Sequence, residues 1–188
     1  MGSHLSHHHP ASAVPSESAD SYRLKASHQA ELRNDCYRRS QQAFQTGDKA
    51  LAKELSTEGK LHAAEMDKYN ELAASTAFAQ RNPRNKGSST SLSQLDLHGL
   101  FVKEALAKLE IHVSACRKAG VTTTTVITGR GSHSKDGIAK IKPAVEEFLK
   151  RERIRAIEDA RNPGSVTLDL DVPEGEAVGW FHSHCLIQ

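Results

Sequence analysis

The sequence contains little of what several large classes of protein depend on. It has three cysteines in 188 residues, and no two of them show the Cys-x-x-Cys spacing of a zinc or redox site. Aromatic residues make up 5% of the chain, no apolar run is long enough to cross a membrane, and the start lacks the pattern of a cleavable signal sequence. We therefore expect neither a disulfide scaffold nor a membrane-spanning protein, and the cysteine usage favours a reducing, cytoplasmic compartment.

The charge is also modest. A formal net charge of +2 is too small to indicate a nucleic-acid partner by itself, so any basic surface must be local. Apolar residues form 37% of the chain, which suits one modest core and not a core that runs the whole length. The composition therefore predicts one folded domain with appended segments.

Shifts in composition divide the chain into five parts. Residues 1–20 are rich in Ser, His, Ala and Pro and are expected to be disordered. Residues 21–80 are rich in Ala, Leu, Lys, Arg, Glu and Gln and contain no proline, which favours long helices. Residues 81–91 combine Pro, Gly and Ser with basic side chains and are interpreted as a linker. Residues 92–172 form the predicted folded domain, and residues 173–188 a flexible tail.

The helical region is predicted to be a hairpin. Gly47 can adopt the left-handed conformation that ends a first helix, and Asp48 can cap a second one. Large apolar residues recur at mostly helical spacing in the second helix, and this stripe is expected to be the packing face of the hairpin: Leu51, Leu55, Leu61, Met66, Tyr69 and Leu72.

The folded domain shows an alternating pattern that predicts an α/β fold with the order βαβαββ. The predicted elements are a strand at 92–97, a helix from 102 to 119, a strand at 122–128, a helix that has Pro143 in its first turn, and strands at 154–157 and 166–172. The first two strands flank a helix, so they are expected to pair in parallel, with helices covering the sheet.

Two short segments at strand ends carry the polar chemistry: Leu95-Asp96-Leu97-His98-Gly99 and Thr128-Gly129-Arg130-Gly131. They should converge, because the carboxyl ends of neighbouring parallel strands meet at one edge of a sheet. Asp96 and His98 are two residues apart on a strand and so share a face, where the carboxylate can orient the imidazole. Taken singly, Asp96 also suits a loop cap and His98 an ordinary surface histidine.

The second segment has the features of an anion-binding loop. Gly129 and Gly131 allow the backbone to approach a ligand, and the loop carries Arg130, His133 and Lys135. Backbone amides, a guanidinium and an ammonium group suit a phosphodiester. The Gly-x-Gly pattern alone is weak evidence, since any tight turn can require it.

Together the LDLHG and TGRG motifs, their interval and the element order resemble the Smr domain, named for small MutS-related proteins, over residues 92–172. The preceding helical region resembles the extension that often precedes Smr domains in eukaryotes. This resemblance implies a fold similar to the C-terminal domain of the third bacterial initiation factor, and nucleic-acid binding or endonuclease activity. The family's glycine-rich turn before the last strand is reduced here to Asn162-Pro163-Gly164-Ser165.

On this basis we expect an RNA endonuclease that needs no metal or other cofactor. His98 would take a proton from a 2′-hydroxyl, Asp96 would orient His98, and Arg130 would stabilise charge on the phosphate oxygens. His133 is the candidate acid, and a metal held by Asp96 with Asp136 stays open. The predicted nucleic-acid-binding residues are Gly99, Gly129, Arg130, Gly131, His133 and Lys135.

Two other functions fit the same residues. The protein could nick DNA, although RNA is favoured over DNA. It could also be an adaptor that binds nucleic acid without cutting and meets a protein partner, such as a ribosome-associated factor, through the helical hairpin. Only the enzyme requires His98 to change its protonation state.

The last four residues, Cys185-Leu186-Ile187-Gln188, match the Cys-aliphatic-aliphatic-X prenylation signal, with a final residue typical of farnesylation. Lipidation of Cys185 would attach this cytoplasmic protein to the cytosolic face of a membrane. The alternative is a chance tetrapeptide, since no polybasic segment lies upstream and a single lipid anchors only weakly.

Overall fold

The computed structural model describes residues 17–83, 92–132, 134, 136–158 and 162–171. Most of both predicted tails, together with His133, Lys135 and Cys185, lies outside the described residues, so the prenylation signal stays a prediction. None of the helices in the described ranges combines the length and the apolar character that a membrane crossing requires.

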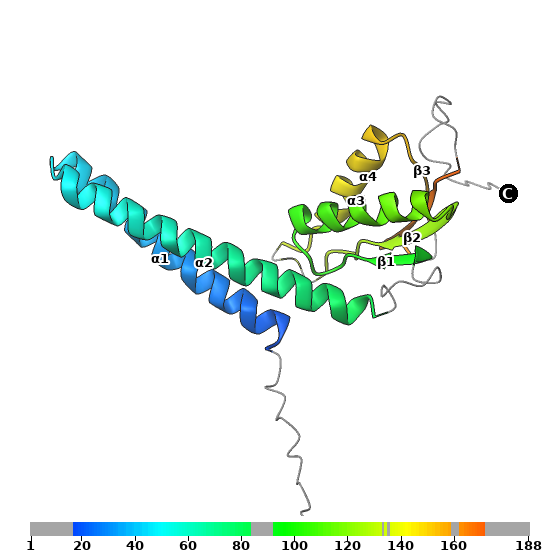
Figure 1. Ribbon diagram of the computed structural model, residues 1–188, viewed down its shortest axis with the longest axis horizontal. Helices are drawn as coiled ribbons and strands as arrows, with labels where there is room; N and C mark the ends of the chain where they lie inside the picture. The colour runs from blue at the N-terminus through cyan, green and yellow to red at the C-terminus, as the bar shows by residue number, and fades with distance from the viewer. Residues whose placement is uncertain (1–16, 84–91, 133, 135, 159–161, 172–188) are drawn as a thin grey trace, which may run out of the picture.

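The N-terminal half is a long antiparallel hairpin of helix α1 (Ala19–Gln45) and helix α2 (Lys49–Arg81), which extends away from the rest of the molecule (Figure 1). The turn between them is the predicted one. Gly47 has a positive φ of 87°, and the Asp48 carboxylate accepts a hydrogen bond from the Leu51 amide at 3.0 Å.

The packing face of the hairpin differs from the predicted stripe of large residues. Leu51 and Leu61 are exposed, at 42% and 66%, and Leu55 is the only member of that stripe that is buried. Small side chains bring two helices close together, and at Gly59 even a Cβ would lie 2.5 Å from the Tyr37 ring. The buried positions of the two helices are mostly small: Ala26, Cys36, Ala43, Ala52, Leu55, Gly59, Ala73, Ala74 and Ala77.

The C-terminal half confirms the predicted α/β fold, with the order βαβαββ after the hairpin. The elements are β1 (Gln94–Asp96), α3 (Val102–Lys118), β2 (Thr123–Ile127), α4 (Ile141–Arg151), β3 (Arg155–Glu158) and β4 (Ser165–Asp169). The sheet order is β1-β2-β4-β3; β1 and β2 are parallel as predicted, and β4 is antiparallel to both of its neighbours. Helices α3 and α4 lie beside each other over the sheet (Figure 1).

The hairpin contributes to the core of this domain. Ala74 and Ala77 of α2 belong to the same buried cluster as the sheet and helix residues Leu95, Leu97, Leu109, Val126, Val145, Leu149 and Leu168. At the other end of the contact, Arg23 of α1 donates two hydrogen bonds to the Glu104 carboxylate, at 3.0 and 2.6 Å, and lies over the Phe101 ring. The hairpin is therefore docked onto the domain rather than joined to it only through the chain.

The predicted linker at 81–91 begins too early. Helix α2 includes Arg81, and Asn82 is its C-cap. Pro83 disfavours helical conformation at Asn82, the residue before it, so the helix ends there and Arg81 is still helical. The first two residues assigned to the linker are thus placed against the domain.

His112 gives the fold a predicted dependence on pH. Its side chain is 5% exposed, its Nε2 lies 2.9 Å from the Thr124 hydroxyl, and burial lowers its pKa below the usual 6.5. As the pH falls below about 6.5, the unfolded chain binds a proton that the folded chain does not, so the free energy of unfolding decreases.

We expect His112→Gln to reduce this loss of free energy of unfolding at low pH. Urea denaturation at neutral and mildly acidic pH measures it, with exposed His28→Gln as the control; equal pH dependence in all three proteins would contradict the prediction.

Candidate functional site

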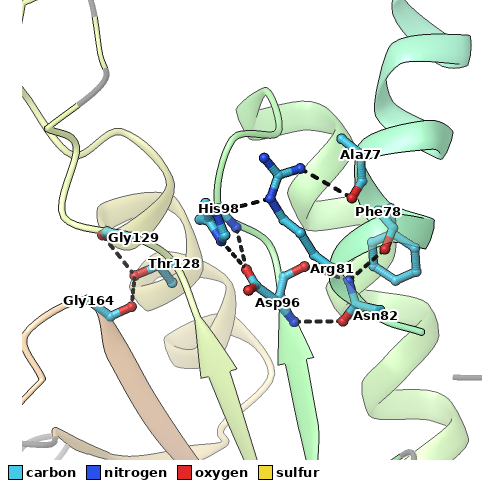
Figure 2. A network of polar contacts seen from close by, with 9 residues as sticks. All are labelled: Ala77, Phe78, Arg81, Asn82, Asp96, His98, Thr128, Gly129 and Gly164. Carbon is cyan, nitrogen blue, oxygen red and sulfur yellow. Dashed lines mark hydrogen bonds and ion pairs between the residues drawn. The ribbon is translucent and has the colours of Figure 1, made fainter. Parts of the chain in front are cut away.

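The two polar segments meet at the carboxyl ends of β1 and β2, as the topology predicted (Figure 2). The amide of Leu97 donates to the carbonyl of Ile127 at 2.8 Å, which continues the parallel pairing to the strand ends. Gly129 then lies directly beside His98, because a Cβ built on Gly129 would be 3.1 Å from the Cβ of His98. The second segment can therefore approach the histidine only through a glycine.

Asp96 holds His98 in one orientation. The Nδ1 atom of the imidazole lies 2.6 Å from Oδ1 of Asp96, and the backbone amide of His98 donates to the same oxygen at 3.0 Å. The Asp96 side chain is 14% exposed, whereas that of His98 is 46% exposed. A largely buried carboxylate thus supports an imidazole that solvent and ligands can reach.

The other ring nitrogen of His98 contacts Arg81, from the last turn of α2. Nε of Arg81 donates to Nε2 of His98 at 3.0 Å (Figure 2). A guanidinium can only donate, so Nε2 carries the lone pair and Nδ1 carries the proton that is donated to Asp96. Sequence reasoning missed Arg81 by assigning it to the linker; Pro83, which favours the end of a helix at the residue before it, was the signal that could have placed the boundary after Arg81.

Asn82 joins the end of α2 to the edge of the sheet. Its Oδ1 accepts from the Asp96 amide at 2.9 Å, and its Nδ2 donates to the Asp96 carbonyl at 2.9 Å and to the Phe78 carbonyl at 3.0 Å. Strand β1 is an edge strand, so the Asn82 side chain pairs with it as a further strand would. This contact fixes the position of Arg81 relative to His98.

Gly99 is required on two grounds. Its φ of +77° is a conformation that residues with a Cβ rarely adopt, and an added Cβ would lie 3.2 Å from Nη2 of Arg81. The glycine of the LDLHG motif therefore leaves room for a guanidinium from the helical hairpin.

The glycine loop after β2 is closely packed against two segments, the residues just before α4 and the turn before β4. Gly131, with φ +79°, is so close to the Ala139 backbone that a Cβ would lie 2.4 Å from its nitrogen. The Gly164 carbonyl accepts from the amides of Thr128 and Gly129, at 2.8 and 3.1 Å, and a Cβ on Gly164 would lie 3.1 Å from Cγ of Arg130. The shortened turn at 162–165 thus retains a backbone contact with the TGRG motif.

Comparison with known proteins accounts for both halves of the chain. Residues 95–165 match the model of the Smr domain, and residues 20–82 match that of a domain of unknown function, DUF1771. The chain belongs to the Smr domain family. The boundary of the second match at residue 82 agrees with the end of α2 at Arg81.

Several Smr proteins are similar over most of this chain. It is 34% identical to a Smr domain-containing protein of Schizosaccharomyces pombe, over 74% of this chain and 65% of that protein. It is 39% identical to Endonuclease NBR9 of Saccharomyces cerevisiae, over 70% of this chain and 52% of that protein. It is 38% identical to NEDD4-binding protein 2 of Homo sapiens, over 68% of this chain and 7% of that protein. The chain thus spans less than two thirds of the length of these relatives.

Among solved structures, the solution structure of the B3BP Smr domain is 38% identical, and the match covers 54% of this chain and 95% of that chain, with a TM-score of 0.41. A crystal structure of the human small-MutS related domain is 40% identical, and its match covers 40% of this chain and 98% of that chain, with a TM-score of 0.35.

Two further predicted residues of the Smr site, Arg130 and Asp136, lie in the described part of the chain and differ in their contacts. Arg130 is exposed, and within the described residues its guanidinium has no hydrogen-bond or ion-pair partner. Asp136 instead pairs with Lys140 at 3.1 Å, and this hydrogen-bonded ion pair lowers the pKa of the Asp136 carboxyl. The carboxylate suggested as a metal partner of Asp96 is thus engaged within its own loop.

A different group of metal-ligating side chains lies in the hairpin. Ligand atoms of Cys36, Glu58 and His62 are all within 4.8 Å of one another, and Nδ1 of His62 lies 2.8 Å from Oε1 of Gln29. Burial is the main cause that raises the pKa of the Cys36 thiol. Cys36 also occupies a position in the helix interface that is comparable to those of the buried residues Ala26 and Ala43, so close packing accounts for its burial without a metal.

Proposed function

We propose that this Smr protein binds single-stranded RNA at the edge formed by β1 and β2 and cleaves it. The observation that carries the proposal is the imidazole of His98, which a largely buried carboxylate holds at Nδ1 and which stays accessible beside the Arg130 loop. The printed names of relatives support the reaction class: Endonuclease NBR9, and Endonuclease MutS2 of Lactobacillus gasseri, which is 37% identical over 73 residues.

The geometry suits cleavage by the RNA's own 2′-hydroxyl. Nε2 of His98 accepts the hydroxyl proton while the 2′ oxygen attacks phosphorus, and the bond from phosphorus to the 5′ oxygen breaks. Asp96 stabilises the imidazolium that forms, and Arg130 donates to the phosphate oxygens as they gain charge. The 5′ oxygen leaves with a proton from an acid, for which His133 is the predicted donor. The products are a 2′,3′-cyclic phosphate and a 5′-hydroxyl.

The test is incubation of the purified full chain with a labelled single-stranded RNA, a DNA of the same sequence, and the same RNA carrying 2′-O-methyl groups. We expect cleavage of the unmodified RNA alone, with cyclic phosphate ends visible by mass spectrometry. A chelator at fixed ionic strength should not change the rate. Cleavage of the DNA or of the methylated RNA would contradict the mechanism, because neither offers a free 2′-hydroxyl.

An adaptor function is the second candidate, and one observation favours it. In the structure Nε2 of His98 accepts a hydrogen bond from Arg81 and is not free to accept a proton. Relatives such as Polyadenylate-binding protein-interacting protein 7 of Arabidopsis thaliana, 36% identical over 69% of this chain and 24% of that protein, have names that refer to protein partners. Salt-dependent RNA binding without any cleavage would support the adaptor over the enzyme.

A further inference from the structure

We propose that Arg81 is a second phosphate ligand of the site, so that the helical hairpin supplies half of the guanidinium pair that grips the RNA. In the free protein Arg81 occupies Nε2 of His98. When a phosphodiester enters, the guanidinium moves to the phosphate and leaves Nε2 free. The inference rests on the proposed RNA binding, and it assigns a role in substrate recognition to a residue outside the Smr domain.

The first argument is the charge balance of Arg81. Among the described residues, no carboxylate lies within ion-pair distance of its guanidinium, which donates to the neutral acceptors His98 Nε2 and the Ala77 carbonyl, at 3.0 and 3.2 Å. The other arginine that joins the hairpin to the domain, Arg23, is paired with Glu104 through two hydrogen bonds. Arg81 is thus a half-buried cation that has no ion-pair partner among the described residues. Arg130, at this edge of the sheet, also lacks an ion-pair partner among them.

The second argument is that the site is shaped around this guanidinium. Gly99 leaves room for Nη2 of Arg81, and the paired hydrogen bonds between Asn82 and the Asp96 backbone fix the end of the helix. A docking arginine would need neither feature, because a carboxylate partner on the domain surface would hold it, as Glu104 holds Arg23.

The third argument is competition between acceptors. A guanidinium hydrogen-bonds more strongly to an anionic phosphate oxygen than to a neutral imidazole nitrogen, because the opposite charges attract each other and a phosphate can accept two parallel hydrogen bonds from one guanidinium. RNA can therefore displace His98 from Arg81, whereas water does not offer this gain. Substrate binding and release of the basic nitrogen would then be one event, which also removes the conflict between the resting structure and the proposed mechanism.

The experiment measures affinity for an uncleavable 2′-O-methyl RNA against salt concentration, by fluorescence anisotropy with the full chain. Each phosphate contact contributes about 0.7 to the slope of log affinity against log salt for a single strand. We expect Arg81→Gln to lower the slope by about 0.7, and Arg81→Lys, which keeps the positive charge, to lower it less. Arg23→Gln is the matched control, because it removes an arginine from the same interface away from the site and should leave the slope unchanged. Thermal melts establish that each variant is folded.

Cleavage of unmodified RNA provides the second measurement. We expect Arg81→Gln to lower kcat by about 10²-fold, the effect of removing one donor to a developing anion. An unchanged slope and an unchanged kcat in Arg81→Gln, with a wild type that cleaves, would overturn the role of Arg81 alone. If the wild type does not cleave but the slope still falls in Arg81→Gln, the phosphate site stands and the endonuclease proposal fails. If Arg23→Gln lowers the slope equally, Arg81 only docks the hairpin.

Discussion

Replacement of His98 by alanine is expected to lower the rate of RNA cleavage by about 10²- to 10⁴-fold, the usual contribution of a general base. The fold should be preserved, because the ring is 46% exposed and Asp96 retains the hydrogen bond from the backbone amide of residue 98. Single-turnover cleavage of labelled RNA measures the rate. The affinity for uncleavable RNA should not fall, since the imidazole is neutral in the resting tautomer and its removal frees Arg81 for the phosphate.

The matched control is His28→Ala, which removes an exposed histidine from α1. A second variant, Asp96→Asn, keeps the shape of the side chain but removes the charge that stabilises the imidazolium, so it should also reduce cleavage. If His98→Ala cleaves RNA at the wild-type rate while folded, His98 is not the base and the proposed mechanism is wrong.

Deletion of residues 1–83 is expected to leave a folded α/β domain that is less stable and cleaves RNA poorly. The deletion uncovers the core where Ala74 and Ala77 pack, and it leaves the Asp96 amide and carbonyl without the Asn82 side chain. Two such hydrogen bonds contribute about 2 kcal/mol together, and loss of the apolar contact adds to this. The truncated domain should therefore melt at a clearly lower temperature than the full chain.

The truncation is measured by thermal denaturation and by cleavage at a temperature where both proteins are folded. The double variant Arg23→Gln, Asn82→Ala weakens the docking without removing Arg81, and it should lose stability but retain more activity than the truncated domain. An unfolded truncation product would show that the hairpin completes the core. Full activity in a folded truncated domain would show that the extension plays no part in cleavage.

The centre of the site could be predicted from the sequence because local rules determine it. Asp96 ends β1 and His98 follows two residues later, within reach of the Asp96 carboxylate, and parallel pairing brings the ends of β1 and β2 to one edge. The turn at Gly47 and Asp48 was predictable for the same reason, since the left-handed conformation and the helix cap involve only neighbouring residues.

The rest depends on contacts between segments that are far apart in the sequence. Arg81 and Asn82 follow a helical pattern and precede a proline, and nothing in that pattern shows that they reach His98 and Asp96. The hairpin interface misled sequence reasoning in another way. Large residues such as Leu61 indicate a packing face by their hydrophobicity, but alanines and Gly59 form this one because they allow the helices to approach closely.

The hairpin also sets a length. Helix α2 has 33 residues, so at about 1.5 Å per residue it is about 50 Å long, with the turn at Gly47 at one end and Arg81 in the site at the other. Because α1 runs back along it for 27 residues, the arm is a braced rod rather than a single helix that bends freely (Figure 1). A partner that contacts the turn at Gly47 would be held about 50 Å from His98. With such a partner, the position of the proposed cleavage would be set by its distance from the partner rather than by base sequence.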